Sequence, residues 1–204
     1  MSHGGGNLRS SHSEIVASYF FIRAFRQKRL RCPNYIVRFL PPASALLLAV
    51  LLANCESSPP PYQYQFIYGQ SAILRNGRAI APRDAPEPVK RAIAAGNQIA
   101  GRPYIYGGGH RSFICKGYDC SGTSSYVLHG AGLLATPIPS DAFRNYGASG
   151  PGEWITVYAR RGHVFMVVAG LRIDTGYNGQ GEGPRWSTMG RPAKGCVLRH
   201  PPGL

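Results

Sequence analysis

The chain has 204 residues, 44% of them hydrophobic, and a formal net charge of +14, a composition typical of globular proteins and unlike that of disordered chains. Seven of the 23 basic residues and one of the nine acids lie in residues 1–54, which leaves 16 against 8 and a charge of +8 for the remainder. These charges are dispersed, and no array of stacking aromatic residues accompanies them, so nucleic-acid binding is not expected.

Residues 1–54 have the features of a leader. The run ASALLLAVLLA at Ala43–Ala53 is eleven residues long, which suits a signal-peptide core and falls short of the roughly twenty residues of a membrane-spanning helix. Asn54 and Cys55 follow this run directly. The pattern resembles the lipobox of bacterial lipoproteins, although Asn54 departs from the usual small residue. We expect an exported, membrane-anchored lipoprotein with its lipid on Cys55. Plain cleavage or an uncleaved anchor is the alternative.

The leader begins unusually far before its apolar core. No methionine occurs between Met1 and Met166, and Val37 opens a compact signal sequence. We interpret residues 1–36 as the product of a misplaced start.

The segment after the leader predicts a spacer and then one folded domain. In residues 55–85, Cys55 is followed by ESSPPPYQYQ, a proline-rich polar stretch that favours a poorly ordered tether. Residues 86–204 are then sufficient for a single core, which we expect to act as a monomer.

The domain predicts a mixture of helices and antiparallel strands. A helix is expected over 86–101, an extended segment ending in three glycines over 102–109, and a short buried helix that starts near Cys120. Three stretches rich in β-branched and aromatic residues predict consecutive antiparallel strands; they are 154–159, 163–169 and 171–175. The fold class is therefore α+β, with an antiparallel sheet packed against the helix that carries Cys120.

Cys120 is the candidate nucleophile. A cysteine at a helix start faces unpaired backbone N–H groups and the positive end of the helix dipole, which favour thiolate over thiol. The same N–H groups can donate to an oxyanion. Simple packing of a buried cysteine is the alternative.

His163 is the candidate base, because it opens the strongly apolar strand GHVFMVV directly after a turn. His129 lies nine residues beyond Cys120 on the same helix, which places it on the opposite face. His110, in the loop after the glycines, and His200, near the end of the chain, suit exposed structural roles.

Asp174 is the candidate orienting residue. If Ala169 and Gly170 form a two-residue turn, Val168 pairs with Leu171, and Asp174 becomes the diagonal neighbour of His163 on one face of the sheet. A three-residue turn would place Asp174 on the other face.

The order of these motifs resembles the NlpC-type peptidases, papain-like cell-wall hydrolases of bacteria. The resemblance runs from about Pro88 to Thr175 through RPYIYGGG, GYDCSG, GHVFMVV and RIDTG. It implies a papain-like fold and hydrolysis of a peptidoglycan stem-peptide amide, typically between γ-D-glutamate and a diamino acid. The chain departs from many members in having Asp174 where they have histidine or asparagine, and in a longer loop over 111–118.

The resemblance also implies roles for individual residues. Cys120 is the nucleophile, His163 the base, Asp174 the orienting residue and Tyr104 the tyrosine beside the thiol. Two residues that flank the nucleophile, Asp119 and Ser121, are expected to contact substrate, with helix capping as the alternative for Asp119.

Cys115 and Cys196 are the remaining cysteines of the exported part, and we expect a disulfide between them. A bond from Cys115 to Cys120, which would silence the enzyme, is the alternative. No metal or other cofactor is expected, because the chain lacks paired ligand spacings such as C-x-x-C.

Two other functions remain open at this point. A thiol acyltransferase or amidase would use the same residues, and a non-catalytic wall-binding lipoprotein would retain the fold with a degenerate site.

Overall fold

A computed structural model describes residues 58–176 and 183–204. The leader, residues 1–36 and the lipidation site at Cys55 lie outside this part of the chain. Within the described residues, no helix has both the length and the apolar character that a membrane span requires.

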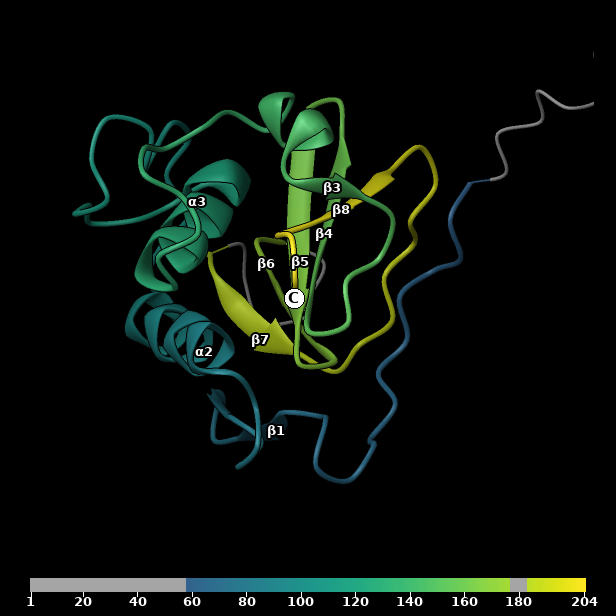
Figure 1. The fold of residues 1–204 in the computed structure, drawn as a ribbon. Helices are drawn as coiled ribbons and strands as arrows, with labels where there is room; N and C mark the ends of the chain where they lie inside the picture. Colours follow the sequence, from purple (N-terminus) through teal and green to yellow (C-terminus); the bar gives the residue numbers. More distant parts are fainter. Residues whose placement is uncertain (1–57, 177–182) are drawn as a thin grey trace, which may run out of the picture. The chain divides into compact units, whose positions relative to one another are not determined.

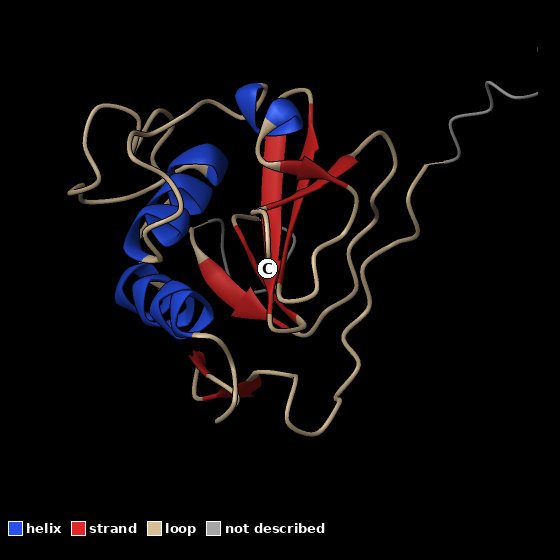
Figure 2. Cartoon of the chain, in the orientation of Figure 1, coloured by secondary structure: helices blue, strands red, loops and turns tan. Residues whose placement is uncertain are grey.

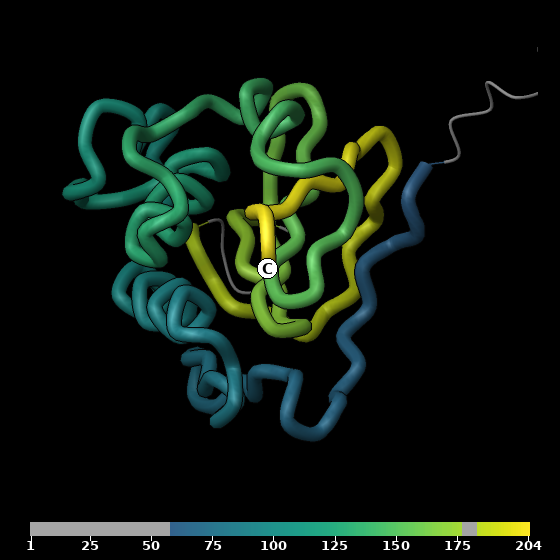
Figure 3. The backbone as a smooth tube through the Cα atoms, in the orientation of Figure 1, coloured from purple at the N-terminus to yellow at the C-terminus, as the bar shows by residue number. Residues whose placement is uncertain are grey.

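Residues 58–85 belong to the folded domain, so the predicted tether is wrong for this segment. Tyr62 is 5% exposed and its backbone pairs with that of Arg191 near the other end of the chain. Its hydroxyl donates to the carbonyl of Gly170 at 2.9 Å. Figure 3 shows this early segment running beside the chain that leads to the last strand. An aromatic side chain and its hydroxyl bond therefore hold in place a segment whose proline-rich start suggests a spacer.

A small hairpin completes this segment. Strands β1 (Ile73–Arg75) and β2 (Arg78–Ile80) pair across a turn at Asn76 and Gly77. Both turn residues have positive φ, 49° and 75°, as a tight hairpin turn requires.

The two predicted helices are present. Helix α2 (Glu87–Ile99) begins directly after Pro86 and buries an apolar face, which includes Val89, Ala92, Ile93 and Ile99. Helix α3 (Cys120–Gly130) starts at the cysteine and is buried along most of its length. The helices pack on each other, and both contact the sheet, as Figures 1 and 2 show.

The main sheet has six strands in the order β3-β8-β4-β5-β6-β7, and all its pairs are antiparallel. The three central strands are those predicted from sequence, and they follow one another in the sheet. The remaining three are short strands that sequence patterning missed. The strands are β3 (Ala148–Ser149), β4 (Ile155–Arg160), β5 (His163–Val168), β6 (Leu171–Asp174), β7 (Arg185–Ser187) and β8 (Val197–His200). A single 3-10 turn, η1 (Ala142–Asn145), precedes them.

Alternation along β5 separates two cores. Val164, Met166 and Val168 join the main cluster with the helices, whereas Phe165 packs with Tyr62 and other residues in a second cluster. Successive side chains of a strand point to opposite faces. One face of the sheet is therefore covered by α2 and α3, and the other by the segments around Tyr62 and Cys196. This α+β arrangement agrees with the predicted fold class.

Candidate active site

Cys120 is the first residue of α3 and is 9% exposed. The preceding Asp119 has an extended backbone, and its Oδ1 accepts a hydrogen bond from the backbone N–H of Gly122 at 2.8 Å. This is a helix N-cap, which satisfies an otherwise unpaired donor of the first turn. The cap sets where the helix starts and so places the sulfur at its positive end.

The glycines of RPYIYGGG form the support beneath this helix start. Asp119 Oδ2 accepts from the backbone N–H of Gly107 at 3.0 Å, and the Asp119 N–H donates to the Gly108 carbonyl at 3.3 Å. A Cβ on Gly122 would lie 1.9 Å from the Gly108 carbonyl oxygen. Glycine at position 122 is therefore required for the helix to approach the loop this closely.

Tyr104 lies on the extended segment that pairs with the chain just before the nucleophile. Its neighbours Pro103 and Ile105 exchange backbone hydrogen bonds with Tyr118, two residues before Cys120. The Tyr104 residue is 39% exposed. Its implied position beside the thiol and its catalytic role both stay predictions.

The base side of the site depends on the β5–β6 hairpin. Val168 pairs with Leu171, and the turn residues Ala169 and Gly170 have φ values of 46° and 74°. The two-residue turn is thus confirmed. It brings His163 Nε2 to 3.0 Å from Asp174 Oδ1, with side-chain exposures of 16% and 0%.

Asp174 is a buried carboxylate held by several donors. Oδ2 lies 2.6 Å from Arg172 Nη1 and 3.3 Å from Arg191 Nε. Oδ1 also accepts from the N–H of Thr175 at 2.7 Å. Buried charges persist only when they are paired and hydrogen-bonded. The two arginines therefore stabilise the buried negative charge of Asp174, which in turn bonds the His163 imidazole.

The electrostatics of His163 link the two sides of the site. Burial by itself lowers the pKa of the imidazole, but side-chain hydrogen bonds to Asp174 and Cys120, together with their charges, outweigh it and raise the pKa from 6.5 to about 9. Three different elements thus contribute to the environment of this ring: His163 is hydrogen-bonded to Asp174, and Cys120 contributes to its raised pKa. At neutral pH this environment favours an imidazolium between sulfur and carboxylate.

Arg191 also contacts the His163 ring, at the nitrogen that faces Asp174. Its Nη2 lies 2.9 Å from the same His163 Nε2 that faces Asp174. A protonated Nε2 donates to Asp174 and offers no lone pair to Arg191, whereas an unprotonated Nε2 accepts from Arg191. The partner of Nε2 therefore depends on whether this nitrogen carries a proton, that is, on the tautomer of the neutral ring.

Sequence reasoning missed two residues of this site, Arg172 and Arg191, and it described His110 as exposed and structural without indicating which groups it contacts. Arg172 shares the face of Asp174 two residues away, so strand alternation is a signal that could have found it. Arg191 comes from the segment after β7, and no local pattern indicates it. His110, expected to be an exposed structural residue, has Nε2 at 2.9 Å from both Asp119 Oδ2 and Ser121 Oγ.

Asp119 and Ser121 support the helix start in the structure, and their predicted contacts with substrate stay predictions. Both residues are buried, at 4% and 3% exposure, and the Ser121 hydroxyl donates to Asp119 Oδ1 at 3.1 Å. We therefore assign both to the support of the helix start, which for Asp119 is the capping alternative.

The predicted disulfide is also wrong, because Cys115 and Cys196 are free thiols in the structure. Cys115 lies in the loop before α3, where its Sγ donates to the Ser112 carbonyl at 3.3 Å. Cys196 is buried with Tyr62 and Phe165 in the second cluster. The sheet and helices separate the two environments. Cys120 is free as well, so the alternative bond to Cys115 is absent.

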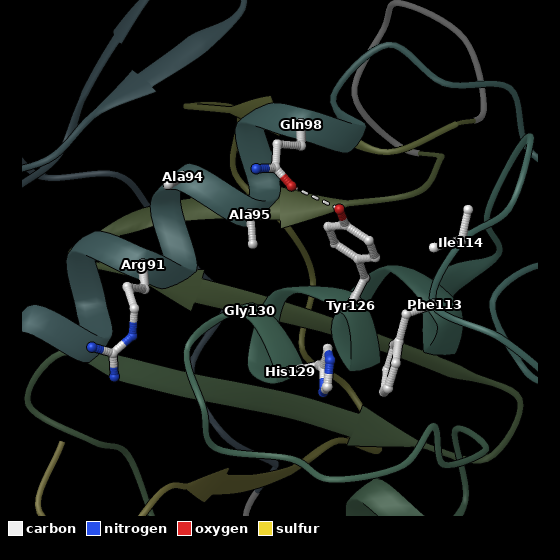
Figure 4. A pocket seen from close by; sticks show the side chains of 9 residues that line it. All are labelled: Arg91, Ala94, Ala95, Gln98, Phe113, Ile114, Tyr126, His129 and Gly130. Atoms are coloured by element: carbon white, nitrogen blue, oxygen red, sulfur yellow. Dashed lines mark hydrogen bonds between the residues drawn. The ribbon is translucent and has the colours of Figure 1, made fainter.

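A groove of about 410 Å³ between α2, α3 and the loop before Cys120 is a different feature. Figure 4 shows Tyr126 bonded to Gln98, and Phe113 beside His129. The Tyr126 hydroxyl donates to Gln98 Oε1 at 2.7 Å, and the ring centroids of Phe113 and His129 are 3.8 Å apart in a stacked arrangement. Cys120, His163 and Asp174 do not line this groove. The groove is therefore not part of the candidate active site. His129 and His200 bond to backbone carbonyls.

Over residues 58–176 and 183–204, no three His, Cys, Asp or Glu side chains gather in a way that could hold a metal ion.

No family model and no curated protein matches the chain. Among solved structures, a mutated form of the Resuscitation Promoting Factor Interacting protein RipA is similar at 23% sequence identity, with a TM-score of 0.43. The similarity covers 61% of this chain and 67% of that chain. It concerns the fold alone and says nothing of activity.

Proposed function

We propose that this protein is an exported cysteine peptidase with a papain-like fold that hydrolyses an amide bond in the stem peptides of bacterial peptidoglycan. The observation that carries the proposal is the hydrogen bond between His163 and the buried Asp174, together with Cys120 at the start of α3, which contributes to the raised pKa of His163. A thiol at a helix start, a buried imidazole and an orienting carboxylate are what nucleophilic acyl transfer needs.

The reaction starts with the thiol proton on His163 and the sulfur as thiolate. The sulfur attacks the amide carbonyl carbon, a C–S bond forms, and the electron pair moves to the carbonyl oxygen. Backbone N–H groups of the first turn of α3 stabilise this oxyanion. When the intermediate collapses, the C–N bond breaks and the leaving amine takes the proton from the His163 imidazolium. A thioester remains on Cys120.

Water completes the cycle. Neutral His163 removes a proton from the water as its oxygen attacks the thioester carbonyl, and the C–S bond breaks. The sulfur regains the proton from the imidazolium, and the products are a carboxylic acid and the free thiol. Asp174 keeps its charge throughout and holds the ring in place, as the third residue does in related triads.

Two sequence features support the wall as the location of the substrate. The combination of PYIYGG, DCSG and a strand that opens with GH resembles cell-wall peptidases of the NlpC type. The leader and Cys55 support export and a lipid anchor at the membrane.

Digestion of purified peptidoglycan by the full chain tests the proposal. The wild-type protein should release peptide fragments with new carboxyl termini, whereas Cys120→Ala should lower the rate at least about 1,000-fold. Cys115→Ala and Cys196→Ala are matched controls, because each also removes a free thiol, and both should retain cleavage. Full activity in Cys120→Ala would refute the peptidase assignment. A new amide in place of a carboxyl terminus would indicate an acyltransferase.

A further inference from the structure

A pocket of about 360 Å³ lies beside the base side of the candidate site. Its lining residues are Arg160, Thr175, Gly176, Arg191, Pro192 and Lys194.

The pocket shares a wall with the proposed catalytic residues. Arg191 lines it and also contacts His163 Nε2 at 2.9 Å and Asp174 Oδ2 at 3.3 Å. Arg160, at the end of β4, is the register partner of His163 on β5. A group bound in this pocket therefore lies one side chain away from the His163 imidazole.

The charge of the pocket has one sign. Three of its lining residues are cations, and none of the six is an acid. Arg160 and Lys194 are both exposed, so a ligand reaches them from solvent. Arg191 already contacts Asp174, and the side chains available to a ligand are mainly those of Arg160 and Lys194. A guanidinium fork and an ammonium group suit a carboxylate, and the Thr175 residue adds a hydroxyl to the lining.

We propose that this pocket binds a free carboxylate of the stem-peptide substrate and thereby positions the scissile amide at Cys120. The assignment rests on the proposed function. In a stem peptide, γ-linked D-glutamate keeps a free α-carboxylate close to its γ-amide, and a diaminopimelate residue keeps a second free carboxylate at the far end of its side chain. Amidation of either carboxylate removes its charge with little change in shape, which allows the two to be tested separately.

The first test measures cleavage of three synthetic peptides. One is L-alanyl-γ-D-glutamyl-diaminopimelyl-D-alanine, and the others have an amide at the D-glutamate or at the diaminopimelate carboxylate. Arg160→Gln and Lys194→Gln should each raise KM about 10-fold for the free acid, since each removes a charge-assisted hydrogen bond to the carboxylate, and should leave kcat within about twofold. For one of the two amides, KM should already be high and should not respond to either substitution.

Arg161→Gln is the matched control, because Arg161 is exposed, adjoins Arg160 in sequence and does not line the pocket. It should leave KM unchanged for all three peptides. An equal rise in KM for Arg161→Gln, or an equal response of the acid and both amides to Arg160→Gln and Lys194→Gln, would overturn the pocket assignment.

Equilibrium binding separates this proposal from the proposed function. Titration calorimetry of Cys120→Ala with the same peptides should show tighter binding of the free acid, and Lys194→Gln in that background should remove the difference. If wild type cleaves the peptides but binding ignores amidation, the pocket assignment fails and the peptidase survives. If wild type does not cleave the peptides but binds the free acid more tightly, the peptidase assignment fails and the pocket assignment survives. Absence of binding by all three peptides also overturns the pocket assignment.

Discussion

The two sides of the candidate site are built in different ways. On the nucleophile side, Asp119 is bonded to groups three to twelve residues away, namely Gly122 and Gly107. On the base side, Arg191 reaches His163 across 28 residues, and the Tyr62 hydroxyl meets the Arg172 N–H across 110 residues. The first side is a local turn and helix cap, and the second is assembled from distant parts of the chain.

The two sides also differ in charge. Asp119 accepts mainly neutral donors of the backbone and of Ser121. Asp174 is fully buried between Arg172 and Arg191, and removing one member of such a network leaves an uncompensated charge in the interior. We expect the base side to be the more sensitive to substitution, and the following predictions test that difference.

The largest expected effect is that of Asp174→Ala, which should lower the free energy of unfolding by about 3–5 kcal/mol, because buried Arg172 loses its carboxylate. Urea unfolding followed by circular dichroism measures it. The matched double variant, Asp174→Leu with Arg172→Met, should recover part of the loss since it removes the buried cation as well. A loss below about 1 kcal/mol for Asp174→Ala would contradict the proposed difference between the sides.

The stability of the base side should also depend on pH. The pKa of His163 is about 9 in the folded protein against 6.5 for an ordinary histidine, so the folded state binds the proton more tightly. This contribution is fully present below pH 6.5 and is lost as the pH rises to 9. It amounts to roughly 3 kcal/mol at most. Urea unfolding across this range should show the fall for wild type and a flatter profile for His163→Gln.

The nucleophile side should respond less. Asp119→Ala removes the helix cap and should cost about 1–2 kcal/mol, because its loss leaves no buried arginine unpaired. Thermal unfolding gives the change, and Asp119→Asn, which retains a capping oxygen, should restore about half of it or more. A cost above that of Asp174→Ala would reverse the expected order.

The smallest change is expected for Tyr62→Phe, which retains the ring in the second core and removes the hydroxyl bonded to Gly170 and Arg172. It should cost about 1 kcal/mol. Tyr68→Phe is the matched control, since Tyr68 is 92% exposed, and it should have no measurable effect. Equal stability of Tyr62→Phe and wild type in urea would show that the early segment adds little to the base side.

The comparison also explains which parts of the site were predictable. Cys120 at a helix start follows from the turn and helix signals around it, and the pairing of His163 with Asp174 follows from the two-residue turn at Ala169 and Gly170. Arg191 was not predictable, because nothing near it in sequence indicates that it returns to β5. The positions of Cys115 and Cys196 in the sequence do not say how far apart they lie in the fold. The structure places Cys115 in the loop before α3 and Cys196 in the second cluster.

The sequence by itself determined the helices, the three central strands and the register of their hairpin, since periodicity, capping and turn geometry act over a few residues. Only the tertiary structure decided that residues 58–85 join the domain, that Arg172 and Arg191 enclose Asp174, and that a cationic pocket adjoins His163. These features depend on burial and charge pairing between segments distant in the chain, and local patterns hold no information about which distant groups will meet.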